Sequence, residues 1–200
     1  MKHPLLIAAL AALPAFALPA LAQADGLPGM RGIDHIGLTV PDLDQAVSFF
    51  GDVLGCSAVT GFGPLSDPEG TFMQDLLAVN PKAVIEKVTL MRCGFGANLE
   101  LFQYSAPDQT TITQKNSDIG AYHIAIYVDD IDAAIAYFDD KGVKHNWGPL
   151  PVTDGPTAGQ KIIYFYAPWG LQMEAITYPD GMAYESDADT VLWSPKAPAE

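Results

Sequence analysis

The stretch that decides the fold is IDHIGLTV at residues 33–40, because a similar stretch, YHIAIYV, returns at residues 122–128. In both, apolar residues alternate with other residue types, which is the period of a half-buried β-strand. Each stretch runs into an acidic turn and an amphipathic helical pattern, at residues 42–54 and 130–141. The chain therefore contains one structural module twice.

Further strand patterns complete both copies. They lie at residues 56–62, 84–93 and 97–104 in the first copy and at residues 143–147, 161–166 and 171–178 in the second. Each copy then has the order β-α-β-β-β. We predict an α+β fold in which two tandem βαβββ modules form a curved mixed sheet. The first module spans residues 32–104, a linker 105–119, the second module 120–178 and a tail 179–200.

A long segment, residues 63–81, separates the second and third strands of the first module. It is longer than a hairpin requires, and such loops are usually functional or mobile. Its apolar residues predict a short helix; they are Phe72, Met73, Leu76 and Leu77. We interpret the segment as a flap over a pocket, and packing against a partner subunit is the alternative.

Residues 1–22 have the pattern of a secretory signal peptide. Lys2 precedes an apolar run, and the small residues at 20–22 suit cleavage before Gln23. We therefore expect export to the periplasm or out of the cell, with no stable membrane insertion after cleavage. A transmembrane anchor is the alternative, and the two prolines within the run count against it.

The charge balance restricts the partners. The chain has 10 Lys and Arg against 24 Asp and Glu, a net charge of −14, and cleavage would remove Lys2 and no carboxylate, giving −15. This field repels phosphate backbones and anionic lipid, so nucleic acid is excluded as an expected partner. We expect a small-molecule substrate, and a homodimer is left open.

The two cysteines, Cys56 and Cys93, suit an exported protein with at most one disulfide. Cys56 begins the second expected strand and Cys93 ends the third, so antiparallel pairing would place them opposite one another. Two small core thiols are the alternative.

One histidine and one glutamate occupy matching places in each module. His35 and His123 lie on the first strands, and Glu100 and Glu174 lie within apolar runs of the last strands. A carboxylate in such a run is costly to bury unless it is paired, protonated or bound to a metal. If the two modules face one another, these four side chains would form the ligand shell of one divalent metal. The alternative is that the histidines are core residues and the glutamates are charges on edge strands. His145 has no counterpart and is interpreted as structural or surface.

With these features the sequence resembles the vicinal oxygen chelate superfamily, which includes glyoxalase I, methylmalonyl-CoA epimerase, extradiol dioxygenases and bleomycin-resistance proteins. The resemblance covers residues 32–178. Its carriers are DHIG at 34–37, LG at 54–55, LEL at 99–101, GAYH at 120–123, VDDI at 128–131 and APWG at 167–170. It implies βαβββ modules around one divalent ion (nickel, zinc, manganese, cobalt or iron), held by His35, Glu100, His123 and Glu174, with no other cofactor.

The resemblance also implies a reaction. Bacterial glyoxalase I has the same ligand types in the same order, so we expect a metal-dependent isomerase or lyase that moves a proton next to a chelated, oxygen-rich small substrate. Either Glu100 or Glu174 would be the catalytic base. Because an exported enzyme meets little glutathione or coenzyme A, the substrate is not named.

Two other functions are left open. The first is an iron-dependent extradiol ring-cleaving dioxygenase, whose aromatic pocket would draw on Phe102, Tyr104, Tyr127 and Trp169. The second is a small-molecule-binding protein of the resistance type. Glu100 favours proton transfer, because the dioxygenases leave this position without a ligand and the binding proteins generally lack the metal shell.

Overall fold

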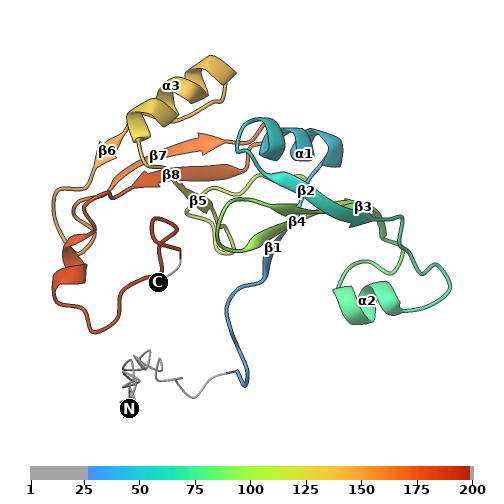
Figure 1. Cartoon of the computed structure of the whole chain (residues 1–200). Coiled ribbons are helices and arrows are strands. Elements are labelled where there is room, and N and C mark those ends of the chain that lie inside the picture. The colour runs from blue at the N-terminus through green and yellow to red at the C-terminus, as the bar shows by residue number, and fades with distance from the viewer. Residues whose placement is uncertain (1–26, 199–200) are drawn as a thin grey trace, which may run out of the picture. The chain divides into compact units, whose positions relative to one another are not determined.

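The repeat takes the form of two four-stranded sheets in the computed structural model, which describes residues 27–198 (Figure 1). Module one consists of β1 (His35–Thr39), α1 (Leu43–Asp52), β2 (Ser57–Phe62), α2 (Phe72–Leu77), β3 (Val84–Arg92) and β4 (Asn98–Ser105). Module two consists of β5 (Ile124–Tyr127), α3 (Ile131–Lys141), β6 (Leu150–Pro151), β7 (Lys161–Tyr166) and β8 (Gln172–Thr177), followed by a 3₁₀ helix, Ala183–Ser186.

The two sheets have the same topology. Their strand orders are β1-β4-β3-β2 and β5-β8-β7-β6, with the first strand parallel to the last and the other neighbours antiparallel. Both belong to one compact unit, which among the described residues spans 33–198. The predicted α+β fold of two βαβββ modules is confirmed, as two mixed sheets that do not close into a barrel within the described residues.

The helices that follow β1 and β5 begin at equivalent aspartates. Asp42 accepts a hydrogen bond from the backbone N–H of Gln45 at 2.8 Å, and Asp130 accepts from Ala133 at 3.0 Å. Such N-caps satisfy backbone donors that a first helical turn leaves free. The acidic turn that occurs in each copy of the repeat is therefore the start of a helix.

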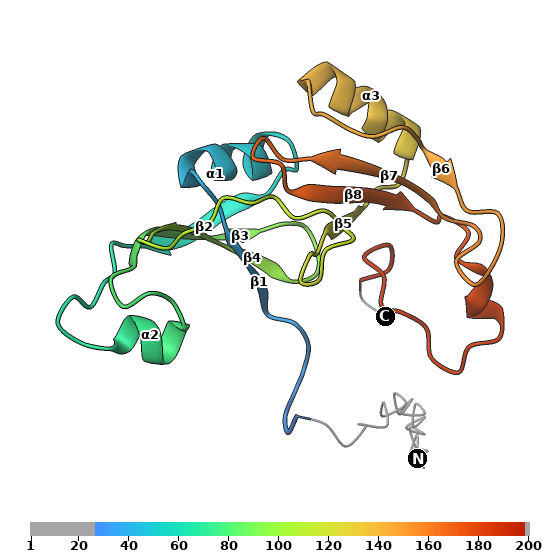
Figure 2. The ribbon, with the colours of Figure 1, turned by 180° about the vertical axis from the view of Figure 1, so that it is seen from behind.

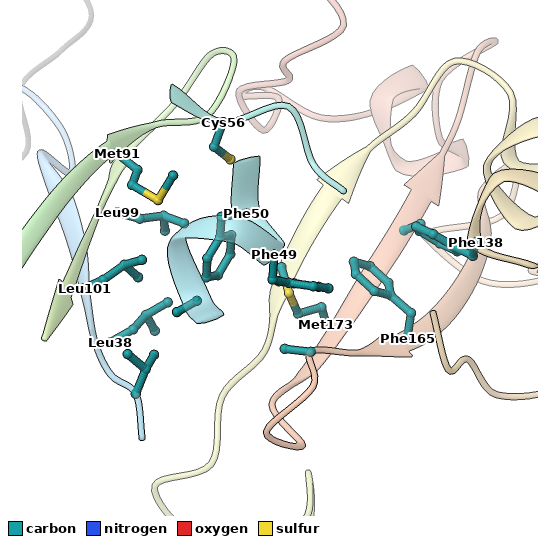
Figure 3. Close-up of a cluster of buried hydrophobic side chains, with 14 of the residues drawn as sticks. Leu38, Phe49, Phe50, Cys56, Met91, Leu99, Leu101, Phe138, Phe165 and Met173 are labelled. Carbon is teal, nitrogen blue, oxygen red and sulfur yellow. The ribbon is translucent and has the colours of Figure 1, made fainter. Parts of the chain in front are cut away.

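The main core lies on the face of the first sheet that α1 covers. Leu38, Leu101 and the α1 residue Phe50 are fully buried there, and apolar side chains of both modules join the same cluster (Figure 3). Phe49 of α1 also meets the ring of Trp169 in module two, with centroids 5.7 Å apart. Truncating a buried aromatic such as Phe50 typically costs about 3–5 kcal/mol. Since β-strand side chains alternate, this packing directs His35 to the opposite face.

The segment expected to be a flap packs on that opposite face. Met73 of α2 is fully buried in a second apolar cluster, which includes Val88 of β3 and the partly buried Phe102 and Tyr104 of β4. Phe102 and Tyr104 alternate with Leu101 and share the face of Glu100. The flap therefore covers part of the sheet face that carries His35 and Glu100 (Figure 2).

One expectation needs correction. Residues 143–147 are not a regular strand: His145 forms an isolated bridge to Phe165, and β6 is only Leu150–Pro151. Pro149 follows this segment and has no N–H to donate to a neighbouring strand, so the edge strand is interrupted.

The tail is joined to module two by a hydrogen bond. The hydroxyl oxygens of Tyr178 and Ser194 lie 2.9 Å apart.

The segments that follow each module reach equivalent turns of the other module. Thr113 in the linker packs over Gly170 in the β7–β8 turn, and Trp193 in the tail packs over Gly96 in the β3–β4 turn.

The expected disulfide is confirmed, since Cys56 and Cys93 are bonded at the ends of β2 and β3.

The expected signal peptide, residues 1–22, lies outside the described residues. Among residues 27–198, no helix has the length and apolar character needed to cross a bilayer.

Candidate metal centre

Strand register brings His35 and Glu100 together. Gly37 of β1 lies opposite Glu100 of β4, and His35 is two residues earlier on the same face. Because Gly37 has no side chain, nothing at that position separates the imidazole from the carboxylate. The Nε2 atom of His35 lies 3.2 Å from the Oε2 atom of Glu100.

Module two repeats this arrangement. Ala125 of β5 lies opposite Glu174 of β8, and His123 is two residues before Ala125. The Nε2 atom of His123 lies 3.3 Å from the Oε2 atom of Glu174. The Glu174 side chain is 9% exposed against 19% for Glu100, so the second carboxylate is the more buried.

Both separations suit a shared ion. Imidazole and carboxylate ligands bind first-row divalent metals at about 2.0–2.2 Å, so two ligand atoms on one ion are roughly 3.0–3.4 Å apart at octahedral or tetrahedral angles. The spacings of 3.2 and 3.3 Å fall in this range. Each pair can therefore supply two adjacent ligands, one nitrogen and one oxygen.

The first histidine has an additional partner. Its Nδ1 atom lies 2.8 Å from Oδ1 of Asp34, which fixes the ring and leaves Nε2 for Glu100 or for a metal. The pKa of His35 is raised, first because of the hydrogen bond to Asp34 and also because of the charges of Glu100 and Asp34, with partial loss of solvation opposing them. A proton on Nε2 competes with a metal, so this half of the site is sensitive to pH.

The structure brings the four predicted ligands together as two pairs and not as one shell. Within residues 27–198, no three His, Cys, Asp or Glu side chains lie close enough to hold one ion. Each pair matches the sequence prediction for its own module.

Comparison with known proteins identifies the superfamily of the chain. The Glyoxalase/Bleomycin resistance protein/Dioxygenase superfamily model matches residues 34–165. The chain belongs to this superfamily. A relative from Actinomyces sp, 2-epi-5-epi-valiolone epimerase, is 41% identical over 172 residues, covering 86% of this chain and 92% of the relative.

Solved structures support the fold. A glyoxalase family protein from Bacillus cereus aligns with a TM-score of 0.57 at 16% identity, covering 78% of this chain and 98% of that one. A glyoxalase family protein from Enterococcus faecalis aligns with a TM-score of 0.51 at 20% identity, covering 73% of this chain and 97% of that one. The predicted membership of the vicinal oxygen chelate superfamily is thus confirmed.

Tyr164, which the sequence did not single out, lies directly opposite Glu174 in the β7–β8 ladder. Its ring meets that of His123 edge-on, with centroids 5.5 Å apart. The pKa of the Tyr164 phenol is raised, first by burial and then by the charge of Glu174 and a hydrogen bond to it. Tyr164 therefore stays protonated beside the second pair and can act as a hydrogen-bond donor.

No sequence pattern marked Asp34 or Tyr164 as a neighbour of the candidate ligands. Asp34 precedes β1, so strand alternation does not predict that its side chain reaches the ring of the next residue. Tyr164 is recognisable only once the register with Glu174 is known, and register was not readable from the sequence.

The other singled-out residues have structural roles or line a cavity. His145 hydrogen-bonds with the carbonyl of Asn146 at 2.9 Å and with Asp139 at 3.0 Å, in keeping with a structural role. Phe102 stacks on Tyr104 beneath α2, and Tyr127 packs edge-on against Tyr178. Trp169 lines a cavity of about 380 Å³ next to module two.

Proposed function

We propose that the protein is a metal-dependent epimerase that moves a proton at a carbon next to a carbonyl of a small, oxygen-rich substrate. The observation that carries this proposal is the repeated His–Glu pair, one in each module, at nearly equal spacing. The superfamily relative at 41% identity is named as an epimerase that acts on 2-epi-5-epi-valiolone. That ketone, or one closely similar to it, is the proposed substrate.

The two glutamates suit the chemistry of inversion. An epimerase removes a proton from one face of a carbon and returns a proton to the other face, so two carboxylates on opposite sides of the substrate can serve as base and acid in turn. Glu100 and Glu174 come from different modules and occupy equivalent register positions. Tyr164, protonated opposite Glu174, can donate its hydrogen bond to this carboxylate and hold it in position.

The donor set fits one divalent ion, which His35, Glu100, His123 and Glu174 would hold. When bound, such an ion supplies Lewis-acid stabilisation of the negative charge that forms on the substrate oxygen as the proton leaves. Asp34 would hold His35 in position for this role.

A complete shell requires the two pairs to face one another. This can happen by approach of the two modules of one chain, or in a homodimer in which the first pair of one copy faces the second pair of its partner. Mixing inactive His35→Ala and His123→Ala proteins distinguishes the two arrangements. After subunit exchange in an equal mixture, a shared shell restores about a quarter of the activity, because about half of the dimers are mixed and one of the two sites in each is intact. A shell within one chain restores none.

We also propose that the protein is exported. The apolar run and small residues before Gln23 support this location, and so does the disulfide between Cys56 and Cys93, since such bonds persist in oxidising compartments. Fractionation of cells that express the full chain, with N-terminal sequencing, tests the proposal. Protein in the cytoplasm that still begins at Met1 would contradict it.

The function itself is tested with 2-epi-5-epi-valiolone in deuterated buffer, with protein depleted of metal and reloaded with each of the five candidate ions. We expect deuterium to enter one carbon, with appearance of an epimer, and we expect chelator to abolish both. Oxygen consumption with catechols and no deuterium exchange would instead favour ring cleavage. Tight binding of the ketone without exchange under any metal would favour a binding protein.

A further inference from the structure

A cavity of about 380 Å³ lies where the linker crosses the end of β1 and the beginning of β8. This volume is within the range of small-molecule sites. Linker residues 109–114 form one wall, and residues 38–41, Tyr122, Trp169 and residues 171–172 form the others.

The lining of the cavity includes chain neighbours of the His123–Glu174 pair, although His123 and Glu174 are not themselves lining residues. Tyr122 directly precedes His123, and Gln172 lies two residues before Glu174 on β8, so the side chains of Gln172 and Glu174 share one face of the sheet. The larger cavity of about 810 Å³ is lined by residues 124–129, the disulfide and the tail, and its lining includes Asp129 and Lys196. The smaller cavity differs from it in having polar side chains and no charged ones.

The lining is polar but carries no charge. In a chain with a net charge of −14, no Asp, Glu, Lys, Arg or His lines this cavity among the described residues. Its polar side chains are Thr, Gln and Tyr: Thr39, Gln109, Thr110, Thr111, Thr113, Gln114, Tyr122 and Gln172. Within residues 27–198, none of these eight side chains makes a hydrogen bond to another protein group. Their donors and acceptors are thus free to bind a ligand.

This chemistry selects a class of ligand. A phosphate or carboxylate would enter a site with no cation to offset the cost of its desolvation. Hydroxyl groups both donate and accept hydrogen bonds, and they match the hydroxyl and amide side chains of the lining. The indole of Trp169 adds an apolar surface against which the C–H groups of a saturated ring can pack.

We infer that this cavity holds the ring of the substrate and that the substrate is a neutral, polyhydroxylated small molecule rather than a phosphorylated or thioester-linked one. The inference rests on the proposed function for its link to catalysis. The binding of neutral polyols can nevertheless be measured without turnover.

The test uses ligand-observed NMR on the full exported chain with two probes, myo-inositol and myo-inositol 1-phosphate. We expect the neutral polyol to bind at least tenfold more tightly than its phosphate. The variant Thr111→Lys places a cation in the cavity at an exposed linker position, so the preference for the neutral polyol over its phosphate should narrow or reverse. Gln109→Lys should have the same effect. The matched control Thr157→Lys, at an exposed position outside the cavity, should leave it unchanged.

The outcomes separate the two proposals. Polyol binding that responds to Thr111→Lys, in a protein without epimerase activity, keeps the cavity assignment and overturns the proposed function. If the protein is an epimerase but neither cavity variant changes the substrate KM or the preference between the two probes, the cavity assignment alone is overturned. Equal or tighter binding of the phosphate by the unmodified protein also overturns it.

Discussion

Asp34 Oδ1 lies 2.8 Å from Nδ1 of His35, on the ring atom that does not face Glu100. The equivalent position before His123 is Tyr122, which cannot accept a proton as a carboxylate does. The two halves of the candidate centre therefore have matching ligands but different supporting groups.

Changing Asp34→Asn should weaken metal binding about 10- to 100-fold at pH 8, because a carboxylate partner fixes the ring and raises its basicity as a ligand. The pKa of His35 is raised by Asp34, so as pH falls the metal affinity of the unmodified protein begins to decrease at a higher pH than that of the variant, and the difference in affinity should narrow. Competition with a chelating dye at several pH values measures this. Tyr122→Phe is the matched control, and equal affinities of Asp34→Asn and the unmodified protein at pH 8 would rule out the supporting role.

His123→Ala should remove most of the metal and lower the thermal stability of metal-loaded protein, since a ligand that binds only the folded state adds to folding free energy. His145→Ala is the control, because its ring bonds to Asp139 and Asn146 instead. Metal analysis of both purified variants decides the matter. Full metal content in His123→Ala would remove this residue from the shell.

Replacing a candidate catalytic glutamate should separate chemistry from metal binding. Glu100→Gln keeps an oxygen ligand but not a proton acceptor, so metal should largely remain while turnover falls about a hundredfold or more. Glu174→Gln should behave in the same way if both carboxylates take part in inversion. If one variant still exchanges deuterium but forms no epimer, the glutamate replaced in that variant is the one that only returns the proton. Full epimerisation by both variants would exclude both glutamates as bases.

The sequence was sufficient for the fold and for each His–Glu pair, because both depend on local periodicity that occurs twice. Alternation along β1 places His35 opposite the core, and the acidic turn of each copy is where its helix begins. The strand expected at residues 143–147 is not regular, because its hydrogen bonding depends on a long-range neighbour, β7, and is cut short before Pro149.

The remaining part of the site depends on register and on segments without periodicity. Tyr164 is placed beside Glu174 by the antiparallel ladder, and the neutral cavity is formed by a polar linker that carries no secondary-structure signal. Contacts of this kind join residues far apart in the chain, so no local pattern predicts them.

The disulfide should contribute measurably to stability. Cys56 and Cys93 are 37 residues apart. Closing a loop of this length lowers the entropy of the unfolded chain and should add about 4 kcal/mol to the free energy of unfolding. Urea unfolding with and without reductant should show a loss of that order, and denatured, unreduced protein should have no titratable thiol. Two free thiols in exported protein would contradict the bond.

His145 should make stability depend on pH. Its pKa is raised, first by the hydrogen bond to the Asn146 carbonyl and next by that to Asp139, whose charge adds to the effect while desolvation opposes it. Because the folded-state pKa lies above the unfolded value of about 6.5, the stabilisation is fully present below pH 6.5 and is lost as pH rises through the raised pKa. The difference in free energy of unfolding between the unmodified protein and His145→Gln should therefore be larger at pH 5.5 than at pH 8.5. Asp139→Asn, which removes the charged partner and keeps the ring, should reduce that pH dependence, and equal differences at the two pH values would show that the ring contributes by packing alone.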